Sequence, residues 1–85
     1  MAQWFIYLLT CSDKSYYCGI TTDVQRRLAQ HNAGKASKYT RARLPASLTA
    51  STLVGDKSEA LRAELFVKRL PREKKIAAVH NKSWS

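Results

Sequence analysis

Residues 4–20 read WFIYLLTCSDKSYYCGI, and this stretch predicts the β-hairpin on which the fold is built. An apolar run covers residues 4–10, a turn-like polar cluster covers 12–15, and a second short apolar run covers 16–20. Two runs rich in aromatic and aliphatic residues around a polar turn are typical of paired antiparallel strands. Tyr7 and Tyr17 lie on these strands, ten positions apart.

The register of the hairpin decides whether Tyr7 and Tyr17 share a face of the sheet. Side chains alternate between the two faces, so both tyrosines point to one side only if opposed positions add to an even number. An odd-numbered loop such as 13–15, with Ser12 opposite Tyr16, meets this condition. A slip of one residue places the tyrosines on opposite faces, and the sequence leaves the register open.

A helix is predicted directly after the hairpin. Thr22 and Gln25 match a capping box, in which each side chain satisfies a free amide at the start of a helix. Val24 and Leu28 form its apolar stripe. Gly34 follows the helix and suits a left-handed C-terminal cap.

The remainder of the chain predicts a loop over 35–43, a strand over 48–54 and a helix over 56–70. Asp56 or Ser58 caps this helix, and Pro71 opens a last short helix that runs to about residue 79. The order β-β-α-β-α-α predicts an α+β domain, a small three-stranded antiparallel sheet flanked by helices. We place this single domain at residues 1–80, with a frayed tail over 81–85.

The charge of the chain favours a polyanionic partner. Fifteen Lys and Arg residues against six Asp and Glu give a formal net charge of +9, which suits nucleic acid, although a solvated basic surface is the alternative. No apolar run approaches the roughly 18–20 residues that span a bilayer, and no signal peptide is recognisable. We therefore expect a cytoplasmic protein without membrane contact. Cys11 and Cys18 predict buried thiols rather than a disulfide or a zinc site.

Glu64 is the one acidic residue without a place in a turn or at a helix start. On a helical wheel it falls at the margin of an apolar arc made by Ala63, Phe66, Val67 and Leu70. A metal ligand is one interpretation of this position. An ion pair with Lys68, four residues further on, is the other.

Arg27 and His31 are four residues apart and therefore share a helix face, beside the Val24–Leu28 stripe. A snorkelling arginine and a polar helix end are the structural alternatives to a functional role. Tyr7 and Tyr17, each taken alone, are better explained as core residues. Function becomes the stronger interpretation only when all five residues are considered together.

Phe5-Ile6-Tyr7, Tyr17-Cys18-Gly19, Arg27, His31 and Glu64 together resemble the signature of the GIY-YIG nucleases in order and spacing. Residues 19–28, 31–35 and 56–62 are similar to small stand-alone bacterial proteins of this family, and the resemblance covers residues 4–78. Phe5 stands in place of the first glycine of the motif, and Cys18 in place of an apolar residue. Neither departure removes a reacting group.

The resemblance implies a GIY-YIG-like fold and a divalent-metal-dependent endonuclease that hydrolyses phosphodiester bonds in DNA. Its catalytic residues would be Tyr7, Tyr17, Arg27, His31 and Glu64. Glu64 would hold a single Mg²⁺ or Mn²⁺ ion, and Arg27 would contact the scissile phosphate. A tyrosine, with Tyr7 as the first candidate, would help to deprotonate the attacking water. His31 would orient or protonate one of the reacting groups.

A basic segment follows the first helix and predicts a nucleic-acid contact. Four cations surround one aromatic residue there, and the set is Lys35, Lys38, Tyr39, Arg41 and Arg43. Such a mixture suits phosphate contacts and base stacking, although a solvated loop is the alternative. DNA is favoured over RNA as the partner. A non-catalytic nucleic-acid-binding module and a protein-interaction domain remain alternative functions.

Overall fold

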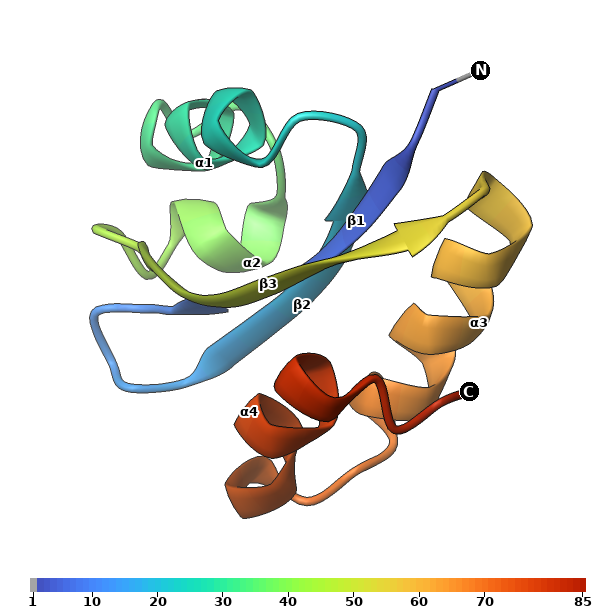
Figure 1. Ribbon diagram of the computed structural model, residues 1–85. Coiled ribbons are helices and arrows are strands. Elements are labelled where there is room, and N and C mark those ends of the chain that lie inside the picture. Colours follow the sequence, from blue (N-terminus) through green and yellow to red (C-terminus); the bar gives the residue numbers. More distant parts are fainter. Residues whose placement is uncertain (1) are drawn as a thin grey trace.

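The computed structural model describes residues 2–85 as one antiparallel sheet with helices on both faces (Figure 1). The elements are β1 (Trp4–Thr10), β2 (Tyr16–Thr21), α1 (Val24–Asn32), α2 (Lys38–Arg41), β3 (Ser47–Gly55), α3 (Lys57–Lys68) and α4 (Arg72–Asn81). The strand order is β2-β1-β3. The predicted α+β class with a three-stranded antiparallel sheet is confirmed. None of the helices within residues 2–85 combines the length and apolar character needed to cross a membrane.

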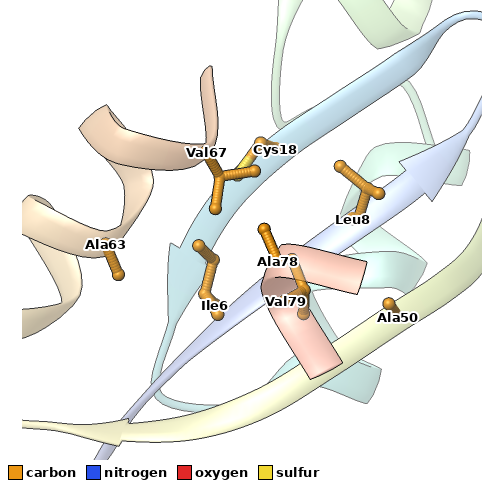
Figure 2. Close-up of a cluster of buried hydrophobic side chains, with 8 residues drawn as sticks. All are labelled: Ile6, Leu8, Cys18, Ala50, Ala63, Val67, Ala78 and Val79. Atoms are coloured by element: carbon orange, nitrogen blue, oxygen red, sulfur yellow. The ribbon is translucent and has the colours of Figure 1, made fainter. Parts of the chain in front are cut away.

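Strand β1 lies in the middle of the sheet and is covered on both sides, so Ile6 to Leu9 are all buried. Ile6 and Leu8 face α3 and α4, where Val67 and Val79 pack against them (Figure 2). Tyr7 and Leu9 belong to the opposite layer, which holds α1 and α2 (Figure 1). The fold therefore has two small cores, and the helix pairs α1/α2 and α3/α4 are separated by the sheet.

The hairpin register places Tyr7 and Tyr17 on the same face. Thr10 opposes Tyr16 and Leu9 opposes Tyr17, so opposed positions add to an even number. The loop has an odd number of residues, as this condition requires, but it is Ser12-Asp13-Lys14 rather than 13–15, so Tyr16 pairs with Thr10 and not with Ser12. Lys14 has a φ of 71°, the left-handed conformation that a three-residue hairpin loop requires.

The structure corrects two predictions about helices near the basic segment. Asp23, not Thr22, caps α1, and its carboxylate accepts from the Arg26 amide at 3.1 Å. Residues 35–43 are not wholly a loop, because Ser37 caps the one-turn helix α2. The left-handed conformation of Gly34 is confirmed by its φ of 75°.

The C-terminal helices begin and end close to the predicted positions. Asp56 caps α3 and forms a capping box with Glu59. Pro71 is the residue before α4 rather than its first residue, and α4 continues to Asn81. Trp84 packs against the core beside α3 and α4, so the chain beyond α4 makes tertiary contact. The domain boundary at residue 80 stays a prediction.

Lys75 and Phe66 differ in their burial within this layer. Lys75 is half-buried, and its ammonium donates to the carbonyls of Val67 and Lys68 at 2.8 and 3.1 Å, which satisfies the C-terminal end of α3. Phe66 was expected to face the core, yet it is 37% exposed. The thiols of Cys11 and Cys18 are free and buried, as predicted.

Candidate active site

A buried chain of hydrogen bonds connects β1, α1 and α2. Tyr7 Oη lies 2.8 Å from His31 Nε2, and His31 Nδ1 lies 2.7 Å from Thr40 Oγ1. The Thr40 hydroxyl donates to the Ser37 carbonyl at 3.3 Å, so its oxygen accepts from the Nδ1–H group of His31. This direction leaves Nε2 of His31 unprotonated, and Nε2 therefore accepts from the Tyr7 hydroxyl.

Burial keeps the chain uncharged at neutral pH. Burial raises the pKa of Tyr7 to about 12, although a hydrogen bond from Arg27 acts in the opposite direction. Burial also lowers the pKa of His31 below its usual 6.5, and the positive charge of Arg27 adds to this effect. Tyr7 therefore keeps its proton, and His31 keeps a free lone pair on Nε2.

The low pKa of His31 predicts a loss of stability in mild acid. The unfolded chain binds a proton at His31 near pH 6.5, where the folded chain does not, so the free energy of unfolding falls as the pH decreases below about 6.5. Urea unfolding at about pH 7.5 and about pH 5.5 measures this change. His31→Gln should reduce the difference, whereas His80→Gln, a matched change at an exposed position, should retain it. If the stability of His31→Gln depends on pH as strongly as that of the native chain, His31 is not the group that causes the loss of stability in acid.

Tyr17 belongs to an aromatic cluster beside this chain. Its ring centroid lies 5.0 Å from that of His31, 6.5 Å from that of Tyr7 and 6.0 Å from that of Tyr39. Arg43 covers Tyr39, with its guanidinium carbon 3.9 Å from the ring centroid. The cluster joins β2 to α2 and brings the end of the basic segment next to Tyr17.

The basic segment divides into two groups in the structure. The Arg43 guanidinium donates to Asp13 and to the Tyr39 carbonyl at 3.0 and 2.9 Å, so Arg43 has an internal role in joining the hairpin loop to α2. The other three cations, Lys35, Lys38 and Arg41, are exposed around α2. These three are free to contact a polyanion, whereas Arg43 and one face of Tyr39 are already engaged.

Arg27 is half-buried on α1, and its guanidinium donates to the Gln30 side chain at 3.0 Å. Its charge acts on both Tyr7 and His31, so these three predicted residues form one electrostatic unit. Tyr17 joins them through ring contacts. Four of the five predicted catalytic residues are therefore brought together.

Glu64 lies apart from these four, on α3 in the other helix layer. Its carboxylate is 3.3 Å from Lys68 Nζ, which is the ion pair weighed above as the structural alternative. Lys68 Nζ is also 6.0 Å from the Tyr17 ring centroid. Lys68 thus links Glu64 to the aromatic cluster at the edge strand β2, and within residues 2–85 no hydrogen bond or ion pair connects Glu64 directly to the other four.

The donor set at Glu64 suits a lightly held divalent ion. Within residues 2–85, no three His, Cys, Asp or Glu side chains gather as a metal site, so a multi-ligand zinc-type centre does not fit. Mg²⁺ is bound through one or two carboxylates, waters and substrate phosphates. The single half-buried carboxylate of Glu64 fits that pattern.

Thr40 and Gly19 complete the site, and sequence reasoning did not find their roles. Gly19 opposes Tyr7 across the hairpin, and a Cβ atom on Gly19 would lie 2.5 Å from Tyr7 Oη and 2.7 Å from Cζ. Only glycine leaves room for the phenol there. Ser37, a residue that favours helix N-caps, is the sequence signal that would have revealed α2 and hence Thr40.

The sequence from residue 3 to residue 77 matches the family model described as the GIY-YIG catalytic domain. The chain belongs to the GIY-YIG family. This finding confirms the resemblance drawn from the hairpin, α1 and α3. The GIY-YIG domain is the catalytic domain of a nuclease superfamily, and GIY-YIG nucleases typically use divalent metal ions.

Similar GIY-YIG proteins are small, like this chain. A UPF0213 protein of Cupriavidus pinatubonensis is 55% identical over 75 residues, which cover 88% of this chain and 83% of the relative. A protein of E. faecalis with a solution NMR structure is 33% identical, with a TM-score of 0.65. The match covers all of this chain and 91% of the E. faecalis chain. A UPF0213 protein of Bacillus halodurans, also solved by NMR, is 46% identical, with a TM-score of 0.57. The match covers 94% of this chain and 85% of the B. halodurans chain.

Proposed function

We propose that this protein is a divalent-metal-dependent endonuclease that hydrolyses phosphodiester bonds in DNA. The observation that carries the proposal is the buried Tyr7–His31–Thr40 chain next to Arg27. An uncharged phenol, hydrogen-bonded to a neutral imidazole of fixed tautomer, can move a proton away from an attacking water.

In this proposal Tyr7 acts as a relay rather than as a standing phenolate. With a pKa raised to about 12, the Tyr7 hydroxyl is protonated at neutral pH. As water attacks phosphorus, Tyr7 Oη takes the water proton and passes its own proton to His31 Nε2. The bond from phosphorus to the leaving oxygen breaks, and that oxygen takes a proton from solvent. His31 Nε2 then returns its extra proton by way of Tyr7 Oη to bulk water, which its lowered pKa favours.

Arg27 and Glu64 would supply the charge that the phosphate requires. The Arg27 guanidinium can bind the scissile phosphate through parallel N–H groups, and it is half-buried, which strengthens that contact. Glu64 would hold a single Mg²⁺ or Mn²⁺ ion once Lys68 leaves its carboxylate. When bound, such an ion polarises the phosphate and stabilises the developing negative charge.

The surface charge supports nucleic acid as the substrate. The net charge of +9 and the exposed set Lys35, Lys38 and Arg41 favour salt-dependent contacts with a phosphate backbone. We propose DNA over RNA, and a cytoplasmic location. A second candidate is a non-catalytic nucleic-acid-binding module, which is favoured by the Glu64–Lys68 ion pair, since this pair satisfies the carboxylate without a metal.

Replacing Glu64 tests the two candidates. The assay is nicking of plasmid DNA, branched DNA and RNA with Mg²⁺, with Mn²⁺ and without a divalent ion. Glu64→Gln should lower cleavage by at least about 100-fold and leave DNA binding largely intact, because it removes the ligand charge but adds no bulk. Glu73→Gln is the matched control, since Glu73 is exposed on α4 and should retain full activity.

Three results would decide against parts of the proposal. Cleavage that survives in Glu64→Gln would remove Glu64 from the site. Salt-sensitive binding without cleavage in either metal would establish the binding module. No binding at low salt would count against both candidates.

A further inference from the structure

The outer side of α3 leaves large apolar side chains uncovered. Leu61 is 47% exposed, Leu65 is 53% exposed and Phe66 is 37% exposed. Leu61 and Leu65 are one helical turn apart, so they form a continuous stripe with Phe66 beside it. The buried residues of the same helix are Ala60, Ala63 and Val67, so packing of α3 against the sheet does not bury Leu61, Leu65 or Phe66.

Two hollows join this stripe to α4. The first, of about 380 Å³, lies along α3, and the second, of about 350 Å³, lies between α3 and α4. Phe66 and Leu70 line both hollows. We call the two hollows together with the stripe the α3–α4 groove. Contiguous exposed apolar surfaces of this kind mark sites of interaction with other molecules.

Basic side chains border the α3–α4 groove. Arg62 and Arg69 line its first hollow, and Lys74 lines its second, where Glu73 is the one acidic residue. The ion pairs formed within residues 2–85 are Arg43–Asp13 and Lys68–Glu64, so the three cations of the border have no carboxylate partner in the described chain. The groove therefore offers an apolar floor and unneutralised positive charge.

We propose that the α3–α4 groove binds an amphipathic helix of a partner protein, with an apolar stripe flanked by acidic side chains. Aliphatic anchors one turn apart suit the helix-in-groove mode of recognition. The basic border provides charge complementarity to acidic flanks. A second copy of this chain is disfavoured because each copy carries a charge of +9 and would bring basic borders together. Nucleic acid is disfavoured because Phe66 is the groove's single aromatic residue, and the leucines offer no stacking plane.

Helices α3 and α4, which form the α3–α4 groove, lie on the opposite side of the sheet from α1 and α2 (Figure 1). A partner helix in the groove therefore leaves the Tyr7–His31–Thr40 chain uncovered. Glu64 of the proposed nuclease site also lies on α3, but the peptide titration reads groove binding directly, so its test needs no cleavage assay.

The test is an NMR titration of the isotopically labelled full chain with designed peptides. The first probe is a helical peptide with leucines at i, i+3, i+4 and i+7 and glutamates elsewhere. A second probe has the same composition in scrambled order, a third replaces the glutamates by lysines, and a fourth is a single-stranded oligonucleotide. We expect only the first peptide to give saturable shifts at the amides of residues 61–77.

Matched variants separate specific docking from general attraction to a basic protein. Leu65→Glu should weaken binding of the first peptide by about tenfold or more, whereas Leu53→Glu, on β3, should not change it. Arg69→Glu should also weaken it, whereas Arg26→Glu, with the same change of charge on α1, should have a much smaller effect. Both groove positions are exposed, and the amide spectrum of each variant reports whether the fold is intact.

Each other outcome would overturn the proposal. Equal binding of the scrambled peptide, or binding that Leu65→Glu does not weaken, would show attraction by charge alone. Oligonucleotide shifts at residues 61–77 would assign the groove to nucleic acid. Self-association in sedimentation that Leu65→Glu abolishes would assign it to a second copy. No saturable binding of the first peptide up to about 1 mM would leave the groove without this partner.

Discussion

Tyr7→Phe should lower the rate of phosphodiester cleavage by about 10²- to 10⁴-fold, while substrate binding changes little. The substitution removes one oxygen atom, and with it the hydrogen bond of 2.8 Å to His31 Nε2. The phosphate contacts proposed for Arg27 and the basic segment remain. The measurement is the single-turnover rate of plasmid nicking, with binding measured separately.

The relay predicts that Tyr7 and His31 act as a unit. His31→Gln should lower the cleavage rate by a similar factor. The double variant Tyr7→Phe/His31→Gln should be little slower than the slower single variant, because the loss of either residue already stops the proton transfer. Thr40→Val removes the acceptor for His31 Nδ1 and should shift the imidazole tautomer, which nitrogen chemical shifts report without any activity. Thr40→Ser keeps the hydroxyl and should restore the native tautomer.

Tyr16→Phe is the matched control for the Tyr7 variant. Tyr16 is the same residue type on the neighbouring strand, but it packs against the core on the α3/α4 side. The control should therefore cleave at the native rate. Retention of more than about a tenth of the activity in Tyr7→Phe would take Tyr7 out of the proton path, and multiplicative losses in the double variant would contradict the relay.

Gly19→Ala should both destabilise the fold and abolish most cleavage. The new methyl group would lie 2.5 Å from Tyr7 Oη, so the phenol, which is buried in the core, must move. We expect a loss of about 1–3 kcal/mol in the free energy of unfolding, typical of overpacking in a core. The Tyr7–His31 hydrogen bond should be lost with it, so the cleavage rate should fall as in Tyr7→Phe.

Gly34→Ala distinguishes displacement of Tyr7 from general destabilisation. Gly34 has a φ of 75°, and an added Cβ would lie no closer than 3.5 Å to Arg41. Its cost is therefore backbone strain of about 1–2 kcal/mol, without displacement of Tyr7. Similar stability losses with cleavage lost only in Gly19→Ala would support the assignment. Normal cleavage in Gly19→Ala would show that Tyr7 does not need this position.

Much of the fold was predictable because its signals are local. The apolar runs of β1 and β2, the cap at Asp56 and the break at Pro71 each depend on a few neighbouring residues, and each prediction agreed with the structure to within one or two positions. The five proposed catalytic residues were also recognisable from their order and spacing. Alternation and helical periodicity assigned them to strands and helices correctly.

Other features depended on contacts between distant segments. The short helix α2 is four residues long, too short for periodicity to reveal, and Thr40 gains its role only when His31 of α1 packs against it. Phe66 fits an apolar arc on a helical wheel, but a wheel does not show how far the sheet extends beneath the helix. The exposure of Phe66 therefore followed from packing.

Local sequence was sufficient to specify the strands, the longer helices, the positive charge and the identity of the proposed reacting groups, because propensity and periodicity act over a few residues. Tertiary packing settled the register that joins Tyr7 and Tyr17 on one face, the tautomer that Thr40 gives to His31, and the separation of Glu64 from the other four residues. Strand pairing and side-chain hydrogen bonds depend on the relative position of distant segments, and a single sequence does not encode that position locally. The room for the Tyr7 phenol above Gly19 is one such relation, since it exists only after the two strands have paired.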